Sequence, residues 1–174
     1  MMRHLSHAGL IGAALFTLPA PAGAAEEGAG CEKFAWSIAP ERAWFAASNR
    51  MKVTAGETLA IAPADAFVVR LQPAAQAAFA MPPERKPRAA EWFGGMVRFP
   101  AMERAGIYQV TLSEEAWVDI VQDGRYARSV GSTGRSDCPG VRKSLRVEIG
   151  STPFVLQLSG VAADTITVSI RPRD

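Results

Sequence analysis

The segment Lys143-Ser-Leu-Arg-Val-Glu-Ile149 decides the fold class, because apolar and polar residues alternate along its whole length. A period of two places the leucine, valine and isoleucine on one face of a β-strand and the polar residues on the other. The same alternation returns in Phe154 to Ser159 and in Thr165 to Arg171. Strands with one apolar and one polar face are typical of antiparallel sheets. We therefore predict that these three segments form an antiparallel meander, with turns at 150–153 and 160–164.

Further strands are expected upstream, on both sides of Asp123-Gly124. Residues 117–122 and 125–130 flank this dipeptide, which tolerates the positive φ angles of a type I′ hairpin turn. Residues 106–113 are rich in β-branched and aromatic side chains and predict another strand.

The front of the chain predicts less regular structure. We expect shorter strands at 57–62, 66–72 and 96–99. One short helix is expected at 40–48, where Pro40 and Glu41 occupy the first turn. Some eight strands at this spacing predict an all-β, antiparallel β-sandwich, jelly-roll-like, with one short helix near the mature N-terminus.

Residues 1–24 have the three parts of a secretory signal peptide. A charged start precedes an apolar run from Leu10 to Leu18, and Ala22 and Ala24 supply an Ala-x-Ala exit. The run is shorter than the roughly 20 residues that a membrane-spanning helix needs. We therefore expect cleavage rather than an uncleaved anchor, and no membrane span afterwards. The remainder, 25–174, is expected to be one periplasmic or secreted domain.

The two histidines, His4 and His7, both lie in the predicted signal peptide. A mature chain without histidine excludes Ser-His-Asp and Cys-His catalysis, histidine-ligated metals and histidine general bases. Without Arg3, 18 of the 19 basic residues remain against 17 acidic ones, and this balance argues against nucleic acid as a partner. We predict no catalytic residue, no metal and no cofactor.

The cysteines Cys31 and Cys138 are an even pair in an oxidising compartment, which predicts a disulfide. A bridge that closes about 100 residues stabilises a fold by roughly 4 to 5 kcal/mol in the chain-entropy estimate. The alternative is a reactive or metal-binding thiol.

Residues 73–91 are rich in proline and alanine and predict a long loop. The loop carries Arg85, Lys86 and Arg88. This basic cluster would suit an anionic envelope component, and the alternative is an ordinary solvated loop.

Five residues near the hairpin and after Cys138 form the candidate ligand site. They would bind a glycan or an acidic peptide through stacking and charge-assisted hydrogen bonds. We expect Asp119 to point outward into solvent, because an inward carboxylate would need a partner such as Arg142 or Lys143. The alternative is that the polar loop at 132–140 only supports the disulfide. The five candidates are Trp117, Asp119, Tyr126, Arg142 and Lys143.

Two carboxylate sites are weaker hypotheses. Asp119, Asp123 and Asp137 could ligate calcium, but they lack the Asp-x-Asp-x-Asp spacing. Glu114 and Glu115 are the visible acidic pair for glycosidase-like hydrolysis. Adjacent strand residues point in opposite directions, and here they sit at a turn.

Residues 106–172 resemble the bacterial pre-peptidase C-terminal domain. In that family a Gly-x-Tyr-x-Val strand, an aspartate among apolar residues, a strand that ends in glycine and one that ends in Ser/Thr-Gly follow one another. This chain departs from the pattern at Thr152-Pro-Phe154, where a tyrosine is expected, and residues 31–95 have no counterpart. The resemblance implies a jelly-roll-like sandwich with an accessory or adhesive role beside secreted enzymes. The matching segments are Gly106-Ile-Tyr-Gln-Val110, Trp117-Val-Asp-Ile-Val121, Val147-Glu-Ile-Gly150 and Phe154-Val-Leu-Gln-Leu-Ser-Gly160.

Together these features predict an exported, non-catalytic accessory or binding module of the bacterial envelope, with a glycan or protein as partner. A structural or stress-related periplasmic protein is the first alternative. A carboxylate-based hydrolase is the second.

Overall fold

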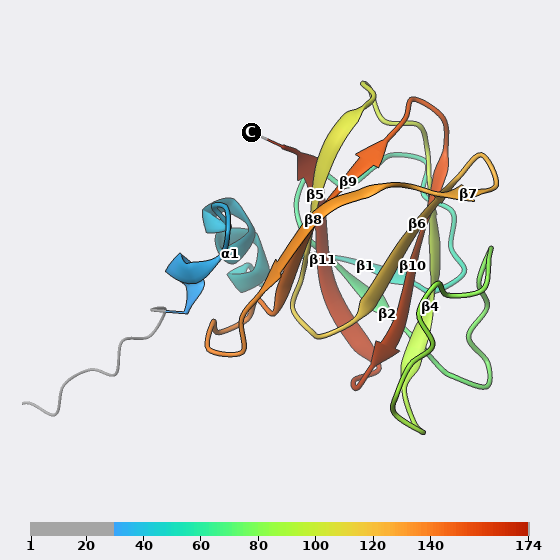
Figure 1. Cartoon of the computed structure of the whole chain (residues 1–174), viewed down its shortest axis with the longest axis horizontal. Coiled ribbons are helices and arrows are strands. Elements are labelled where there is room, and N and C mark those ends of the chain that lie inside the picture. The colour runs from blue at the N-terminus through green and yellow to red at the C-terminus, as the bar shows by residue number, and fades with distance from the viewer. Residues whose placement is uncertain (1–29, 174) are drawn as a thin grey trace, which may run out of the picture.

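Two β-sheets face each other in the computed structural model, which describes residues 30–173 (Figure 1). The predicted all-β sandwich with one short helix is confirmed. The predictions for residues 1–24 lie outside the described residues. The larger sheet has the order β1-β2-β11-β5-β9-β8, with β1 at Met51–Thr54, β2 at Phe67–Arg70, β11 at Thr165–Pro172, β5 at Gly106–Leu112, β9 at Lys143–Ile149 and β8 at Ser129–Gly134. The smaller sheet has the order β3-β4-β10-β6-β7, with β3 at Gln72–Pro73, β4 at Phe93–Phe99, β10 at Phe154–Val161, β6 at Trp117–Gln122 and β7 at Arg125–Tyr126.

The core lies between the sheets and consists of the apolar rows that the period of two predicts. On β9 these are Leu145, Val147 and Ile149, all buried. Phe99 of β4 and Phe154 of β10 stack with ring centroids 4.9 Å apart. Burial of such rows is the main favourable contribution to folding.

The predicted meander is wrong in its pairing, although its three strands are correct. β9 and β11 both belong to the larger sheet, where β5 lies between them, whereas β10 belongs to the smaller sheet. The turns after β9 and β10 therefore cross from one sheet to the other. A strand with one apolar face can bury that face from either sheet, so alternation alone does not decide which strands pair.

The hairpin at Asp123-Gly124 is confirmed. Gln122 pairs with Arg125, and Asp123 and Gly124 have φ angles of 52° and 71°. The second arm is shorter than predicted because the chain leaves β7 and crosses to the larger sheet as β8 (Figure 1).

The predicted strand at 57–62 is wrong. The first strand is β1, and residues 57–62 make only an isolated bridge between Thr58 and Arg98. Ile61 is 81% exposed, so this stretch has no buried face that a strand would need.

The outer face of the larger sheet is covered by the start of the described chain. This N-terminal cover, Cys31–Ala46, contains a 3-10 turn at Cys31–Lys33 and the helix α1 at Ala39–Ala46. Cys31 and Cys138 form the predicted disulfide, with their Cα atoms 4.7 Å apart. The bridge fixes the cover to the loop between β8 and β9.

The outer face of the smaller sheet is covered by residues 74–92, here called the loop cover. This segment contains no helix or strand and lies on the opposite side of the sandwich from α1 (Figure 1). Both sheets thus have covered outer faces, and the polar residues of several strands are buried there.

Candidate ligand-binding site

Gln157 on β10 holds the loop cover. Its Oε1 accepts hydrogen bonds from the backbone N–H groups of Ala80 (2.6 Å) and Met81 (2.9 Å). Its Nε2 donates to the Met81 carbonyl at 3.0 Å. One buried amide thus satisfies three backbone groups of a segment that has no ladder of its own.

Asp119 lies opposite Gln157 in the sheet and also faces the loop cover. Its Oδ1 accepts from the indole Nε1 of Trp117 at 2.7 Å, and its Oδ2 accepts from the backbone N–H of Glu84 at 3.3 Å. The side chain points outward as predicted, but the expectation of a solvated carboxylate is wrong. Only 3% of the residue is exposed, because the loop cover lies over it.

Burial raises the pKa of Asp119 above its usual range, since the charged form loses solvation. The hydrogen bonds from Trp117 and Glu84 oppose this rise, and the Glu84 carboxylate adds to it. A carboxyl group that stays protonated to a higher pH than usual can act as a hydrogen-bond donor.

Tyr126 also holds the loop cover, because its hydroxyl donates to the carbonyl of Pro82. Desolvation, followed by the charges of Asp119 and Glu84, raises the pKa of this phenol. Tyr126 therefore lies close enough to Asp119 and Glu84 for their charges to act on its hydroxyl.

Trp117 carries two cations near its ring. The Arg85 guanidinium lies 5.4 Å and the Lys143 Nζ 5.5 Å from the ring centroid, both within the range of cation–π attraction. Lys143 Nζ also donates to the carbonyl of Ala116 at 2.7 Å. Burial lowers the pKa of Lys143; Glu115 acts in the opposite direction, and Arg85 lowers the pKa further.

A small pocket opens where the chain leaves β7 for β8, and we call it the Trp117 pocket. Its volume is about 120 Å³, close to the space of about four water molecules. Charged and polar side chains lie at its rim and apolar side chains form its floor. It is lined by Glu84, Trp117, Val118, Asp119, Ile120, Ala127, Ser129, Ser132, Lys143, Leu145 and Val147.

Four of the five predicted site residues come together here. Trp117, Asp119 and Lys143 line the pocket, and Tyr126 holds the adjacent loop cover. Arg142, which immediately precedes β9, does not line it. The backbone N–H of Arg142 instead bonds to the Leu112 carbonyl at 2.9 Å.

Sequence reasoning missed Glu84 and Ser129 as lining residues, and it named Ser132 only as the start of the polar loop at 132–140. It singled out the basic cluster of the loop without linking it to Trp117, and Arg85 is the member that reaches the ring. No local signal could have placed residue 85 beside residue 117, because the contact depends on how the loop folds back over β6.

The carboxylates proposed for calcium are separated. Asp123 accepts a hydrogen bond from Thr152, and Asp137 pairs with Arg135 and Lys33. Among residues 30–173, no group of three or more His, Cys, Asp or Glu side chains is placed to hold a metal ion.

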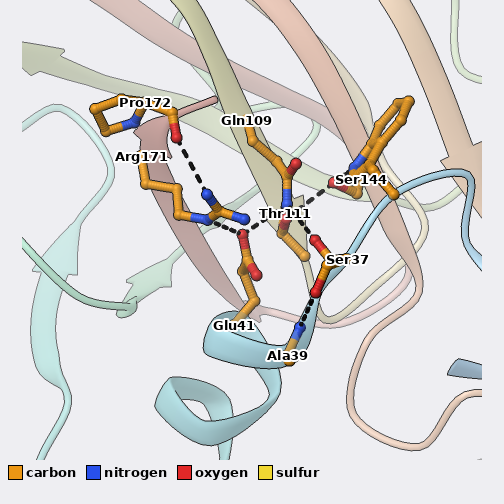
Figure 2. Close-up of polar contacts among 9 residues, drawn as sticks. Ser37, Ala39, Glu41, Gln109, Thr111, Ser144, Arg171 and Pro172 are labelled. Carbon is orange, nitrogen blue, oxygen red and sulfur yellow. Dashed lines mark hydrogen bonds and ion pairs between the residues drawn. The ribbon is translucent and has the colours of Figure 1, made fainter. Parts of the chain in front are cut away.

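A second buried polar cluster lies under the N-terminal cover and was not predicted (Figure 2). Glu41 of α1 is fully buried, and its Oε1 accepts from the Nε of Arg171 and the Nε2 of Gln109, each at 2.7 Å. Gln109 also donates to the Ser37 carbonyl at 3.1 Å. A buried charge needs such partners, and this cluster therefore fixes α1 on the sheet.

Two serines and one lysine line the Trp117 pocket. Lys143 donates to the backbone carbonyl of Ala116, and in the described part of the chain no hydrogen bond joins it to Ser129 or Ser132. Glu115 is 76% exposed and lies 3.8 Å from Lys143, and it points into solvent at the turn before β6.

Comparisons with known proteins identify no relative of this chain. No protein-family model, curated protein or solved structure matches this chain. Within the described residues, no helix is long and apolar enough to cross a membrane.

Proposed function

We propose that the protein is an exported, non-catalytic binding module of the bacterial envelope, periplasmic or secreted, and that the Trp117 pocket is its ligand site. One observation carries the proposal. Lys143 and Asp119 line the same small pocket and both contact Trp117, but they do not pair with each other: Asp119 accepts the Trp117 indole N–H, and Lys143 bonds to the Ala116 carbonyl and lies 3.8 Å from Glu115. An enclosed pocket with separated polar groups is the usual form of a small-ligand site.

Two features of the chain support export. The first 24 residues have the composition of a signal peptide. The Cys31–Cys138 bridge is of the kind that persists in oxidising compartments. The resemblance of residues 106–172 to pre-peptidase C-terminal domains supports an accessory role, and it remains a prediction.

The pocket size also limits the ligand. Sites for whole drug-sized ligands occupy about 300 to 1,000 Å³, whereas this one has about 120 Å³. It therefore accepts the end of a larger molecule or one small group, and the rest of the ligand would lie across the rim.

The test is a binding screen by NMR on isotope-labelled, oxidised protein. We would titrate N-acetylglucosamine oligomers, free amino acids and short peptides, and record backbone amide shifts. We expect at least one class to shift residues that line the Trp117 pocket. Ser132→Trp should fill the pocket and abolish these shifts.

Ser136→Trp is the matched control, since Ser136 is exposed in the turn after β8 and does not line the pocket. It should bind like the wild type. If no probe class shifts the pocket, or if Ser132→Trp binds as well as the control, the pocket is not the ligand site. A structural or stress-related protein would then be the better proposal.

A further inference from the structure

The first half of β6 has an unpaired edge. On one side β6 pairs with β10 over Trp117–Gln122, and on the other it pairs with β7 only at Val121 and Gln122. The backbone N–H of Ala127 still reaches the Ile120 carbonyl at 2.7 Å. Beyond that point the chain crosses to the other sheet, and no strand of the described chain follows this edge.

The backbone groups of Val118 face this opening. In a strand, the N–H and C=O of alternate residues point to the same side. Since the Ile120 carbonyl points toward β7, the N–H and C=O of Val118 point the same way, into the Trp117 pocket that Val118 lines. An extended peptide could therefore add one residue pair to β6.

The side chains around this edge limit which residue the peptide can have at its carboxyl end. Ile120, Ala127, Leu145 and Val147 form an apolar floor. With room for about four water molecules, the floor accepts a small apolar side chain and excludes an aromatic one.

Positive charge lies at the rim. Lys143 donates one hydrogen bond to the Ala116 carbonyl and lies 3.8 Å from the exposed Glu115 carboxylate, and an ammonium has three donors in all. Arg85 lies close enough to lower the pKa of Lys143, so the two cations repel each other. An anion between them would relieve this repulsion and accept charge-assisted hydrogen bonds.

We infer that the Trp117 pocket binds the free carboxyl end of an extended peptide whose last side chain is small and apolar. The peptide backbone pairs with Val118, the side chain lies on the apolar floor, and the terminal carboxylate bonds to Lys143 and Arg85. This inference rests on the proposed function and names its ligand class.

The carboxylate of Asp119 does not oppose this arrangement. Its oxygens accept from Trp117 and from the backbone of Glu84, on the outer side of the smaller sheet. Lys143 belongs to the row of β9 that also contains Leu145 and Val147, and it reaches the pocket from between the sheets. Asp119 and Lys143 thus lie on different sides of β6, whereas Glu84 and Arg85 both belong to the loop cover on the outer side.

The test compares N-acetyl-Ala-Ala, which has a free carboxylate, with the same dipeptide as its C-terminal amide. We expect the acid to bind the oxidised protein at least tenfold more tightly than the amide by NMR titration. The acid should also shift the Val118 amide and slow its hydrogen exchange. N-acetyl-Ala-Trp should bind at least tenfold more weakly than N-acetyl-Ala-Ala.

Three variants test whether Lys143 binds the terminal carboxylate of the peptide. Lys143→Met should remove the preference for the acid, Lys143→Arg should restore most of it, and Lys52→Met, an exposed control on β1, should leave it unchanged. A thermal melt of each variant verifies folding. Equal binding of acid and amide, or an unchanged preference in a folded Lys143→Met, would overturn the inference. If a sugar or another probe still shifted the amide signals of the pocket residues, the proposed ligand-binding function would remain supported. If no probe shifted them, both the peptide inference and the proposed function would be overturned.

Discussion

The two covers of this sandwich differ in how they are held. The N-terminal cover is fixed by a disulfide, by the buried Glu41–Arg171 pair and by Trp36, whose Nε1 donates to Ser144 at 2.9 Å. The loop cover is fixed mainly by side chains of the sheet that bond to its backbone, from Gln157, Asp119 and Tyr126.

The candidate site lies beside the loop cover, which contributes Glu84 to its lining. Covalent and buried ionic contacts make the N-terminal cover part of the rigid fold. A loop without its own ladder opens at lower free energy, and binding regions are commonly drawn from such parts of a protein. We therefore expect opening of the loop cover to admit a ligand while the N-terminal cover stays in place.

The largest loss of stability is expected when the disulfide that fixes the N-terminal cover is removed. Replacing both cysteines by alanine should lower the free energy of unfolding by about 4 to 5 kcal/mol, because the bridge closes a loop with a sequence separation of 107. The melting temperature should fall by roughly 10 to 20 °C. Circular dichroism melts measure this effect. An unchanged midpoint would show that the bridge does not stabilise the fold and that the N-terminal cover is held by its other contacts.

Removing Glu41 should come next. Glu41→Ala deletes the carboxylate to which Arg171 and Gln109 donate, and breaking a buried ion pair costs roughly 3 to 5 kcal/mol. Urea unfolding measures the loss. The control is Glu32→Ala, since the Glu32 side chain is 84% exposed in its pair with Arg42, and exposed pairs contribute less than about 1 kcal/mol. Similar losses in the two variants would contradict a buried pair that fixes α1.

A smaller effect is expected under the loop cover. Gln157→Leu removes the partner of three backbone groups at residues 80 and 81, which should cost about 1 to 3 kcal/mol. Hydrogen exchange should accelerate in residues 80–84 and remain slow in α1. Gln76→Leu, an exposed position in the same loop, should change neither quantity. Faster exchange in α1 would show that the covers open together.

The smallest effect concerns pH. Burial raises the pKa of Asp119 above the value of about 3.9 in an unfolded chain, so the folded state keeps this proton to a higher pH. Between the two pKa values the free energy of unfolding falls as pH rises, and the loss is complete above the folded value.

Asp119→Asn cannot titrate and serves as the reference for this effect. Measured from about pH 3.5 to 7, the wild type should lose stability relative to the variant as pH rises, following the sign of the linkage relation. Asp65→Asn, at an exposed position, is the control and should follow the same pH dependence as the wild type. A constant difference between wild type and Asp119→Asn would mean that the loop cover does not desolvate this carboxylate.

Much of the candidate site could be predicted, for a simple reason. Trp117, Asp119 and Tyr126 are close in sequence on one hairpin, and the packing of the two sheets brings Lys143 of β9 near Trp117. The prediction for Arg142 failed because the sequence did not distinguish it from Lys143, and only Lys143, the first residue of β9, lines the pocket. Arg85 and Glu84 come from a loop whose path no local pattern specifies.

The sequence by itself determined most of the strand segments, the hairpin turn and the short helix, and it predicted the cysteine pair. Each of the first three follows from interactions between near neighbours, such as a period of two or the φ preferences of Asp-Gly. Only the tertiary structure decided that β9, β10 and β11 alternate between sheets and that both polar outer faces are covered. Those outcomes depend on contacts between distant residues, such as Glu41 and Arg171, 130 positions apart. A strand's pattern shows which face is apolar but contains no information on what will cover the other.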